Sequence, residues 1–334
     1  MENKRMNKGH KHKLVWLGLI VLLVCVIPGS LYVYHKKRST APRRIICIPK
    51  IIDQENDFWV QLLEGVKMAG LEYGMEVEIV AAGREDAFEE QNQLIYWAIE
   101  QKPSAIILVP SSLSDTAQAA AAVEQSGIPL ILMDSEVENR GDVPLVATDN
   151  VEAGRIQGQF MAGLLDKDSK IALVAHVKGS STALDREQGV REGLGEYASN
   201  IVDVVYCDSD YDKAYELMNQ ILDRYPDLDM VAGLNEYSAV GAARAVVNRG
   251  LQGQVRLVGF DSSLEEIRLL EQGIFEGIVI QNPYKMGYLA VEAANQALKG
   301  EKVKVDIDSG AKLITREEMF TDENQKLLFM FSED

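Results

Sequence analysis

The stretch that decides the fold class is residues 43–82, "RRIICIPKIIDQENDFWVQLLEGVKMAGLEYGMEVEIVAA". A β-branched run opens it, apolar residues at helical spacing follow over 57–73, and a second β-branched run closes it at 75–82. A strand, a helix and a second strand in this order predict a βαβ unit, in which the two strands are parallel. Parallel sheets are covered by helices on both faces, which explains why the first strand is a continuous apolar run.

The same alternation continues to residue 281. Further strand patterns occupy 105–110, 129–134, 145–149, 170–177, 201–207, 230–235, 255–261 and 275–281. Helical patterns separate them at 86–101, 115–126, 151–166, 183–197, 211–224, 237–249 and 263–272. About ten strands and 334 residues exceed one comfortable sheet and one domain. We therefore expect an α/β fold of two doubly wound parallel-sheet lobes.

The N-terminal segment has a different character. Residues 14–34, "LVWLGLIVLLVCVIPGSLYVY", carry no charge over 21 positions. As a helix rising about 1.5 Å per residue they would span roughly 32 Å, close to the thickness of a bilayer core. The run is longer than the apolar region of a signal peptide, and no A-x-A-like cleavage site follows. We interpret residues 1–44 as a cytoplasmic basic flank and an uncleaved transmembrane anchor; a cleaved signal peptide is the alternative.

Charge and cysteine usage exclude several classes of function. The chain has a net charge of −17 and residues 1–44 carry +9, so the remaining 290 residues carry −26. Such a surface repels phosphate backbones, and nucleic acid is therefore not expected as a partner. Cys25 lies in the apolar run, whereas Cys47 and Cys207 lie in predicted strands. We interpret these two as small buried hydrophobic residues, not as a disulfide or a metal site.

Polar and aromatic side chains gather where the predicted strands end. In open parallel sheets, ligands bind outside the carboxyl ends of the strands. The residues that follow those ends are Asn56, Phe58, Trp59, Asp134, Asn235, Asp261 and Gln281. Asp134, Asn235 and Asp261 have an alternative role as helix caps or turn residues, and the two rings have an alternative role as a hydrophobic staple. Their repetition favours a cleft for a polyol, in which carboxylates and amides bind hydroxyls and the rings cover C–H faces.

Catalytic motifs are absent from the sequence. No G-x-G-x-x-G, G-x-x-x-x-G-K-[ST] or G-x-S-x-G occurs, and His176 is the single histidine after residue 44. We interpret His176 as a strand-end residue, because a triad or a multi-histidine zinc site needs more partners. No catalytic residue, cofactor or metal is expected. The carboxylates of Asp134 and Asp261 leave a glycoside-acting enzyme as the alternative function.

Several motifs together resemble one family. In chain order they are "NDFW", "LILMDS", "LVATDNVEAG", "STALDREQGVREGL", "GLNEYSAVGAARAV", "LVGFDSS" and "IVIQNPYKMG" followed by "ALKGEKV". From about residue 43 to 315 the chain resembles the type I periplasmic sugar-binding proteins, and is most similar to the ribose-binding group.

The resemblance implies an organisation into lobes. Three crossings, near 148–150, 281–283 and 305–309, would form a three-stranded hinge. The N-terminal lobe would comprise 45–148 with 283–305, the C-terminal lobe 149–281 with 306–320, and residues 321–334 a tail. The apolar residues of the tail most simply pack onto a lobe, with docking to a partner as the alternative.

The resemblance also implies the ligand contacts, with two departures. Ribose binders carry Arg directly after the strand-four Asp, where this chain has Ser135. The second family arginine corresponds to Gln188, with Arg186 two positions earlier as a substitute. The loss of both arginines puts D-ribose in doubt, and another pentose, a hexose or an inositol fits as well. The expected ligand-binding residues are Asn56, Phe58, Trp59, Asp134, Ser135, Arg186, Gln188, Tyr211, Asn235, Asp261 and Gln281.

The function implied is capture of a sugar outside the cytoplasm. The lobes would close on a monosaccharide or polyol, and the membrane-tethered protein would present its closed form to an ABC permease or to a membrane sensor kinase. Repressors of the lactose type share the two-lobed body but need an N-terminal helix-turn-helix. The apolar run at 14–34 takes its place here, which excludes DNA binding.

Overall fold

The computed structural model describes residues 43–329. The expected basic flank and membrane span, and residues 330–334, lie outside the described residues. No helix within 43–329 has the length and apolar character needed to cross a membrane. Residues 44–329 belong to one compact unit, and the two lobes described below are both part of it.

The first lobe is built on a six-stranded sheet with the order β11-β5-β4-β3-β1-β2. The pairings of β1 with β3, β3 with β4, β4 with β5 and β5 with β11 are all parallel. The strands are β1 (Arg43–Ile48), β2 (Met75–Ile79), β3 (Ala105–Leu108), β4 (Leu130–Met133), β5 (Leu145–Ala147) and β11 (Asp306–Asp308).

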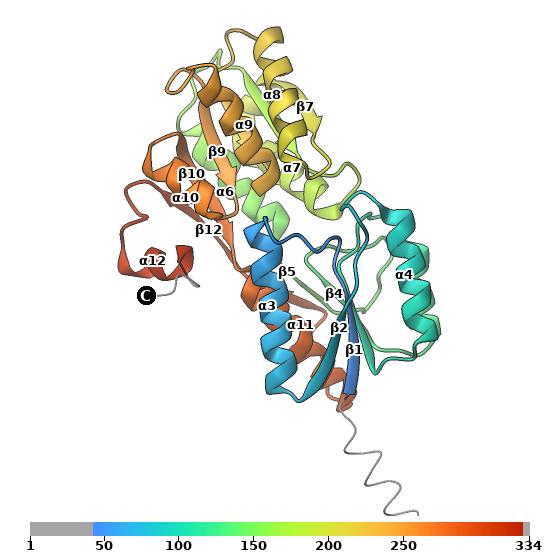
Figure 1. The fold of residues 1–334 in the computed structure, drawn as a ribbon. Coiled ribbons are helices and arrows are strands. Elements are labelled where there is room, and N and C mark those ends of the chain that lie inside the picture. Colours follow the sequence, from blue (N-terminus) through green and yellow to red (C-terminus); the bar gives the residue numbers. More distant parts are fainter. Residues whose placement is uncertain (1–42, 330–334) are drawn as a thin grey trace, which may run out of the picture. The chain divides into compact units, whose positions relative to one another are not determined.

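Helices cover both faces of this sheet (Figure 1). They are α3 (Asp57–Glu72), α4 (Phe88–Glu100), α5 (Ala117–Gln125) and α11 (Pro283–Leu298). Successive side chains of a strand point to opposite faces. Accordingly Ile45 packs in one core cluster with residues of α3 and α11, whereas Ile46 packs in another with residues of α4 and α5.

The second lobe has a sheet with the order β12-β10-β9-β8-β6-β7. Its strands are β6 (Ile171–Ala175), β7 (Ile201–Tyr206), β8 (Met230–Gly233), β9 (Arg256–Phe260), β10 (Phe275–Gln281) and β12 (Ala311–Thr315). Its helices are α6 (Asn150–Ala162), α7 (Ser181–Leu194), the short 3₁₀ helix η2 (Gly195–Asn200), α8 (Tyr211–Arg224), α9 (Glu236–Asn248) and α10 (Leu264–Glu271). The two parallel-sheet lobes predicted from the sequence are confirmed.

Three details differ from the prediction. The edge strand β12 runs antiparallel to β10, so the second sheet is not wholly parallel. Strand β11 pairs with β5 of the first sheet, although the expected boundary places 306–320 in the second lobe; the chain crosses between lobes only after Asp308. Helix α11 is missing from the predicted helices, because its start, "NPYKMG", suggests a turn.

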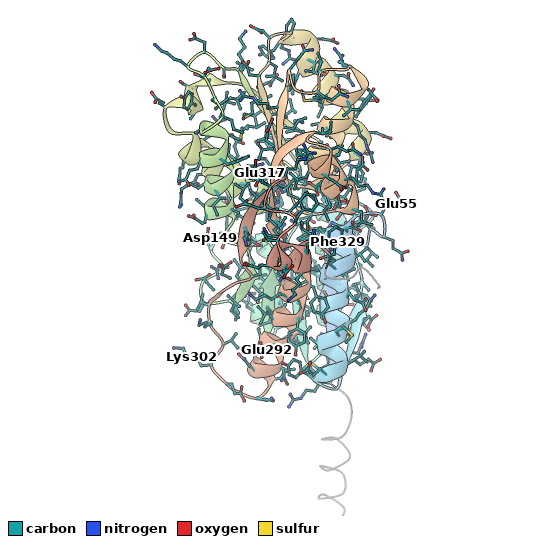
Figure 2. All side chains as sticks on the ribbon, turned by 90° about the vertical axis from the view of Figure 1, so that its left-hand side faces the viewer. Glu55, Asp149, Glu292, Lys302, Glu317 and Phe329 are labelled. Carbon is teal, nitrogen blue, oxygen red and sulfur yellow. The ribbon has the colours of Figure 1, made fainter. Side chains whose placement is uncertain are left out.

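The three crossing segments are bonded to one another by side chains. They are 148–149 between β5 and α6, 282 between β10 and α11, and 309–310 between β11 and β12. The Thr148 hydroxyl donates to Gln281 Oε1 at 2.9 Å and lies 3.1 Å from Ser309 Oγ. Because the single hydroxyl hydrogen of Thr148 is donated to Gln281, the Ser309 hydroxyl donates to Thr148 Oγ1. Figure 2 shows Asp149 at the level between the lobes.

The chain ends with a short helix on the second lobe. Helix α12 (Asp322–Leu328) follows β12, and Met319 and Leu328 are buried in the same core cluster as Ile314 and Phe275. Within the described part of the tail, Leu327, Leu328 and Phe329 therefore pack onto the second lobe, as expected.

Candidate functional site

A cavity lies between the lobes. It is at the carboxyl ends of both sheets, where ligands of parallel sheets bind. The lining residues are Lys50, Asn56, Phe58, Trp59, Glu85, Asp134, His176, Thr182, Arg186, Asn235, Tyr237, Asp261 and Gln281.

Eight of the eleven expected ligand-binding residues line this cavity, namely Asn56, Phe58, Trp59, Asp134, Arg186, Asn235, Asp261 and Gln281. The other three do not. Ser135 lies behind Asp134 and donates from Oγ to Asp134 Oδ2 at 2.7 Å. Tyr211 donates to Glu236 Oε1 at 2.5 Å and accepts from Asn56 Nδ2 at 3.3 Å, so it supports the site from outside.

Gln188 is the third residue outside the cavity, and its expected role needs correction. It is exposed on α7 and donates to Glu192. Two positions along a helix turn a side chain to the far side, so Arg186 and Gln188 cannot face the same cavity. The cationic group at this wall is therefore Arg186, which is only 3% exposed.

Arg186 is held by both the backbone and neighbouring side chains. Its Nε donates to Asn150 Oδ1 at 2.8 Å and its Nη1 donates to the carbonyl of Leu234 at 2.8 Å. The guanidinium lies 3.8 Å from the centroid of the Phe260 ring, a cation–π distance. Burial lowers the pKa of Arg186, and Asp261 and Asp134 counter this change.

A close crossing of two helices sets the position of Arg186. A Cβ on Gly154 of α6 would lie 2.3 Å from the Arg186 carbonyl oxygen, and a Cβ on Gly189 of α7 would lie 2.1 Å from the Val151 carbonyl oxygen. Only glycine permits this approach. The spacing of glycines along "NVEAGRIQG" and "REQGVREG" thus fixes the distance between Asn150 and Arg186.

Lys50 supplies the cation that Ser135 lacks. Its Nζ lies 3.0 Å from Asp134 Oδ2, and both side chains are nearly fully buried. The sequence could have indicated this contact, because Lys50 in "ICIPK" closely follows a buried strand. A lysine at such a position is shielded from solvent and needs an acidic partner. The two arginines expected of a ribose binder are thus matched in charge by Lys50 and Arg186.

The two carboxylates adopt an uncommon backbone conformation. Asp134, after β4, has φ of 63° and Asp261, after β9, has φ of 89°. Aspartate tolerates this left-handed region because its short polar side chain bonds locally. Asp261 accepts from the Glu236 amide at 2.9 Å and from Gln281 Nε2 at 2.6 Å. Burial raises the pKa of Asp261, and Arg186 opposes the rise.

Two of the expected residues both cap a helix and line the cavity. The side chain of Asn56 accepts from the Trp59 amide at the start of α3, and that of Asn235 accepts from the Ser238 amide at the start of α9. Capping uses only the amide oxygen, so Asn235 keeps its Nδ2 group for other bonds, and Asn56 keeps the Nδ2 hydrogen that is not donated to Tyr211. The rings of Phe58 and Trp59 meet edge to face, with centroids 5.1 Å apart.

The remaining lining residues were not predicted as ligand contacts. His176 Nε2 lies 2.8 Å from Thr182 Oγ1, and burial together with Arg186 and Lys50 lowers the pKa of His176 well below its usual value. The imidazole is therefore neutral. Glu85 and Tyr237 come from a loop and from the second residue of α9, positions that no strand-end argument reaches.

The lobes contact each other around the cavity. The Tyr237 hydroxyl donates to Asp53 Oδ2 at 2.6 Å, and the Leu264 amide donates to Asp57 Oδ2 at 2.9 Å. On another side, the Glu136 amide donates to Ser181 Oγ at 2.9 Å. Each bond joins the first lobe to the second, so the structure is a closed arrangement.

The part of the chain from 43 to 329 contains no cluster of three or more His, Cys, Asp or Glu suited to a metal ion. Within the same part, Cys47 and Cys207 are buried and free, as expected. Burial raises the pKa of each thiol to about 12, which keeps both protonated and unreactive.

Known proteins resemble this chain over most of its length. Residues 49–302 match the family model described as "Periplasmic binding protein domain". The ribose import binding protein RbsB of Bacillus subtilis is 29% identical over 261 residues, 78% of this chain and 84% of that protein. A sugar transporter from Clostridium phytofermentans is 43% identical with a TM-score of 0.77, covering 81% of this chain and 98% of that one. A carbohydrate transporter solute binding protein from Agrobacterium radiobacter, in complex with D-arabinose, is 25% identical with a TM-score of 0.82, covering 86% and 99%.

Proposed function

The chain belongs to the type I periplasmic binding protein family, and on that premise we propose that it binds one monosaccharide or small polyol between its two lobes. The observation that carries this proposal is the cavity wall. Buried carboxylates, amides and cations from both lobes converge there beside the rings of Phe58 and Trp59. Such groups can pair with adjacent hydroxyls while the rings cover the C–H faces of a sugar.

A binding role fits better than an enzymatic one. The relatives described above are named as import binding proteins and transport components. A glycoside-acting enzyme is therefore not the function of this chain.

Closure of the lobes is the proposed mechanism. Lys50 and Asp134 belong to the first lobe and Arg186, Asn235 and Asp261 to the second, so a sugar bonded to both sets favours the closed form over the open one. Because Lys50 and Arg186 supply the two cations whose loss spoke against D-ribose, D-ribose returns to the candidate ligands.

Thermal unfolding of the full-length protein with single sugars tests the proposal. The panel comprises D-ribose, other pentoses, hexoses and polyols, and a ligand that binds only the native form raises the melting temperature by mass action. Titration calorimetry on Asp261→Ala should then show an affinity at least tenfold weaker, since about 2 kcal/mol or more is lost when a partner hydroxyl is left unpaired. Absence of any shift across the panel would exclude a neutral sugar as the ligand.

The setting we propose is extracytoplasmic, with residues 14–34 as the membrane anchor. The tether would hold the lobes close to one membrane partner at high effective concentration. That partner would be an ABC permease or a sensor kinase that reads the closed form. Adjacent permease and ATPase genes alone would favour uptake, and an adjacent kinase and response regulator would favour sensing.

A further inference from the structure

Glu85 receives hydrogen bonds from both lobes inside the cavity. It lies in the loop between β2 and α4 and is 4% exposed. Trp59 Nε1, in the first lobe, donates to Glu85 Oε1 at 2.6 Å. Ser209 Oγ, in the second lobe, donates to Glu85 Oε2 at 2.7 Å. One carboxylate thus bonds both the aromatic wall of the cavity and the opposite lobe.

The turn that carries Ser209 is built to present its hydroxyl. Asp208 and Ser209 have φ of 53° and 56° in the loop between β7 and α8. Two consecutive residues in this region are unfavourable without glycine. The Asp208 amide donates to the His176 carbonyl at 2.9 Å, and the Asp210 amide donates to that of Cys207 at 3.1 Å. These bonds hold the turn.

Burial of the Glu85 carboxylate is offset only in part by its surroundings. Burial raises the pKa of Glu85, and Lys50 and the donors Ser209 and Trp59 lower it by less, so the pKa remains raised. Hydrogen bonds to a charged acceptor are shorter and about twice as strong as neutral ones. The bonds from Trp59 and Ser209 are both in the short range, so each constrains its partner firmly.

We propose that Glu85 is a positioning residue that fixes the plane of the Trp59 ring and couples it to closing of the lobes through Ser209. The inference rests on the proposed role of the cavity as a sugar site. When the lobes separate, Ser209 leaves with the second lobe and Glu85 keeps only the indole N–H. Closing restores the second bond, so the ring that covers the sugar is locked at the step in which the sugar is enclosed.

A first experiment is run with and without saturating D-ribose, because the bond from Ser209 to Glu85 forms only when the lobes close. The full-length protein is labelled with ¹⁵N-tryptophan, and the indole N–H resonance of Trp59 is followed in Ser209→Ala. Ser181→Ala is the matched control, because it also removes one hydroxyl bond between lobes, to the Glu136 amide, but has no contact with Glu85. With D-ribose bound, Ser209→Ala should shift the Trp59 resonance and Ser181→Ala should not, whereas without sugar neither variant should shift it. An unshifted resonance in sugar-bound Ser209→Ala would overturn the coupling.

A second experiment follows release of D-ribose by stopped-flow fluorescence. Ser209→Ala should raise the dissociation rate about tenfold, the loss of one hydrogen bond to a charged group. In a Glu85→Ala background, Ser209→Ala should change the dissociation rate by less than twofold. Ser181→Ala should change the rate by the same factor in the Glu85→Ala background as in the wild type. Equal effects of Ser209→Ala in both backgrounds would refute the proposal.

Glu85→Gln guards against a trivial loss of folding. Its amide oxygen can still accept from Trp59 Nε1, so the Trp59 resonance should stay near its wild-type position, unlike that of Glu85→Ala. A Glu85→Gln variant as perturbed as the alanine variant would count against positioning by hydrogen bonding. If D-ribose does not bind at all, the proposed function fails in that form, and the sugar-free resonances of Glu85→Gln and Glu85→Ala still decide whether Glu85 positions the Trp59 ring.

Discussion

Replacing Lys50 by methionine should destabilise the protein by about 3–5 kcal/mol, because it leaves the Asp134 carboxylate buried without its counter-ion. The two charges lie 3.0 Å apart and are 3% and 5% exposed. At an effective dielectric of about 20, their attraction is about 5 kcal/mol before the cost of removing both from water. Methionine keeps the length and apolar stem of lysine, so the change isolates the charge.

The double variant Lys50→Met with Asp134→Asn separates stability from binding. Asparagine tolerates the left-handed backbone at 134 and can still accept from Ser135 Oγ. With no unpaired charge left, the double variant should recover most of the stability lost by Lys50→Met. Its affinity for the sugar should remain at least tenfold weaker than that of the wild type, because the charge-assisted bonds are gone.

Urea unfolding followed by circular dichroism measures the first effect, and titration calorimetry measures the second. A Lys50→Met variant within 1 kcal/mol of the wild type would show that Asp134 is solvated or protonated without its partner. A double variant no more stable than the single one would show that the loss comes from packing and not from an unpaired charge.

Three further predictions concern the helix crossing, a buried acid and the hinge. Gly154→Ala should lower the free energy of unfolding by about 1–3 kcal/mol and weaken sugar binding, since its Cβ would lie 2.3 Å from the Arg186 carbonyl oxygen. Chemical denaturation measures the loss, and Gly163→Ala is the control because its Cβ would have no contact closer than 3.4 Å. Burial raises the pKa of Glu236 from 4.5 to about 8, so the proton is held more tightly in the folded state and stability should fall as pH rises from about 4.5 to 8. Melting temperatures across that range should decline less in Glu236→Gln, and an unchanged slope would contradict the assignment. Thr148→Val should cost about 1–2 kcal/mol of unfolding free energy by breaking the bonds between crossings, and calorimetric affinity should fall with it; a silent substitution would mean the crossings are held by other contacts.

The elements and part of the cavity follow from local pattern. Short continuous apolar runs such as "AIILVP" predict buried strands of a parallel sheet. The polar residue after each run then lies at the carboxyl end of the sheet, where ligands bind. Asp134 and Asp261 could therefore be predicted from the sequence. Gln188 was misplaced because a sequence match ignores which way a helix faces, and its neighbour Arg186 carries the cation instead.

Other features of the site arise only from tertiary contacts. Glu85 sits in a loop whose sequence has no period, and its two partners are 26 and 124 residues away. Strand β11 has only three residues, too few to reveal which sheet it joins. His176 and Thr182 are close in sequence, but the pKa of the imidazole is lowered first by burial and then by Arg186 and Lys50, all of which depend on other elements.

The order in which the strands return along the chain bears on synthesis at the ribosome. The sheet of the first lobe gains β11 only when residues 306–308 have emerged, and α11 of that lobe begins at Pro283. Five of the six strands of the second lobe, by contrast, come from one continuous stretch, 171–281. When residue 281 has been added, the first lobe still lacks α11 and β11, whereas the sheet of the second lobe lacks only its edge strand β12. The second lobe can therefore fold first, the reverse of the usual N-terminal-first order. Arrested nascent chains ending soon after 281 should therefore show protease protection of the later stretch before that of residues 43–147.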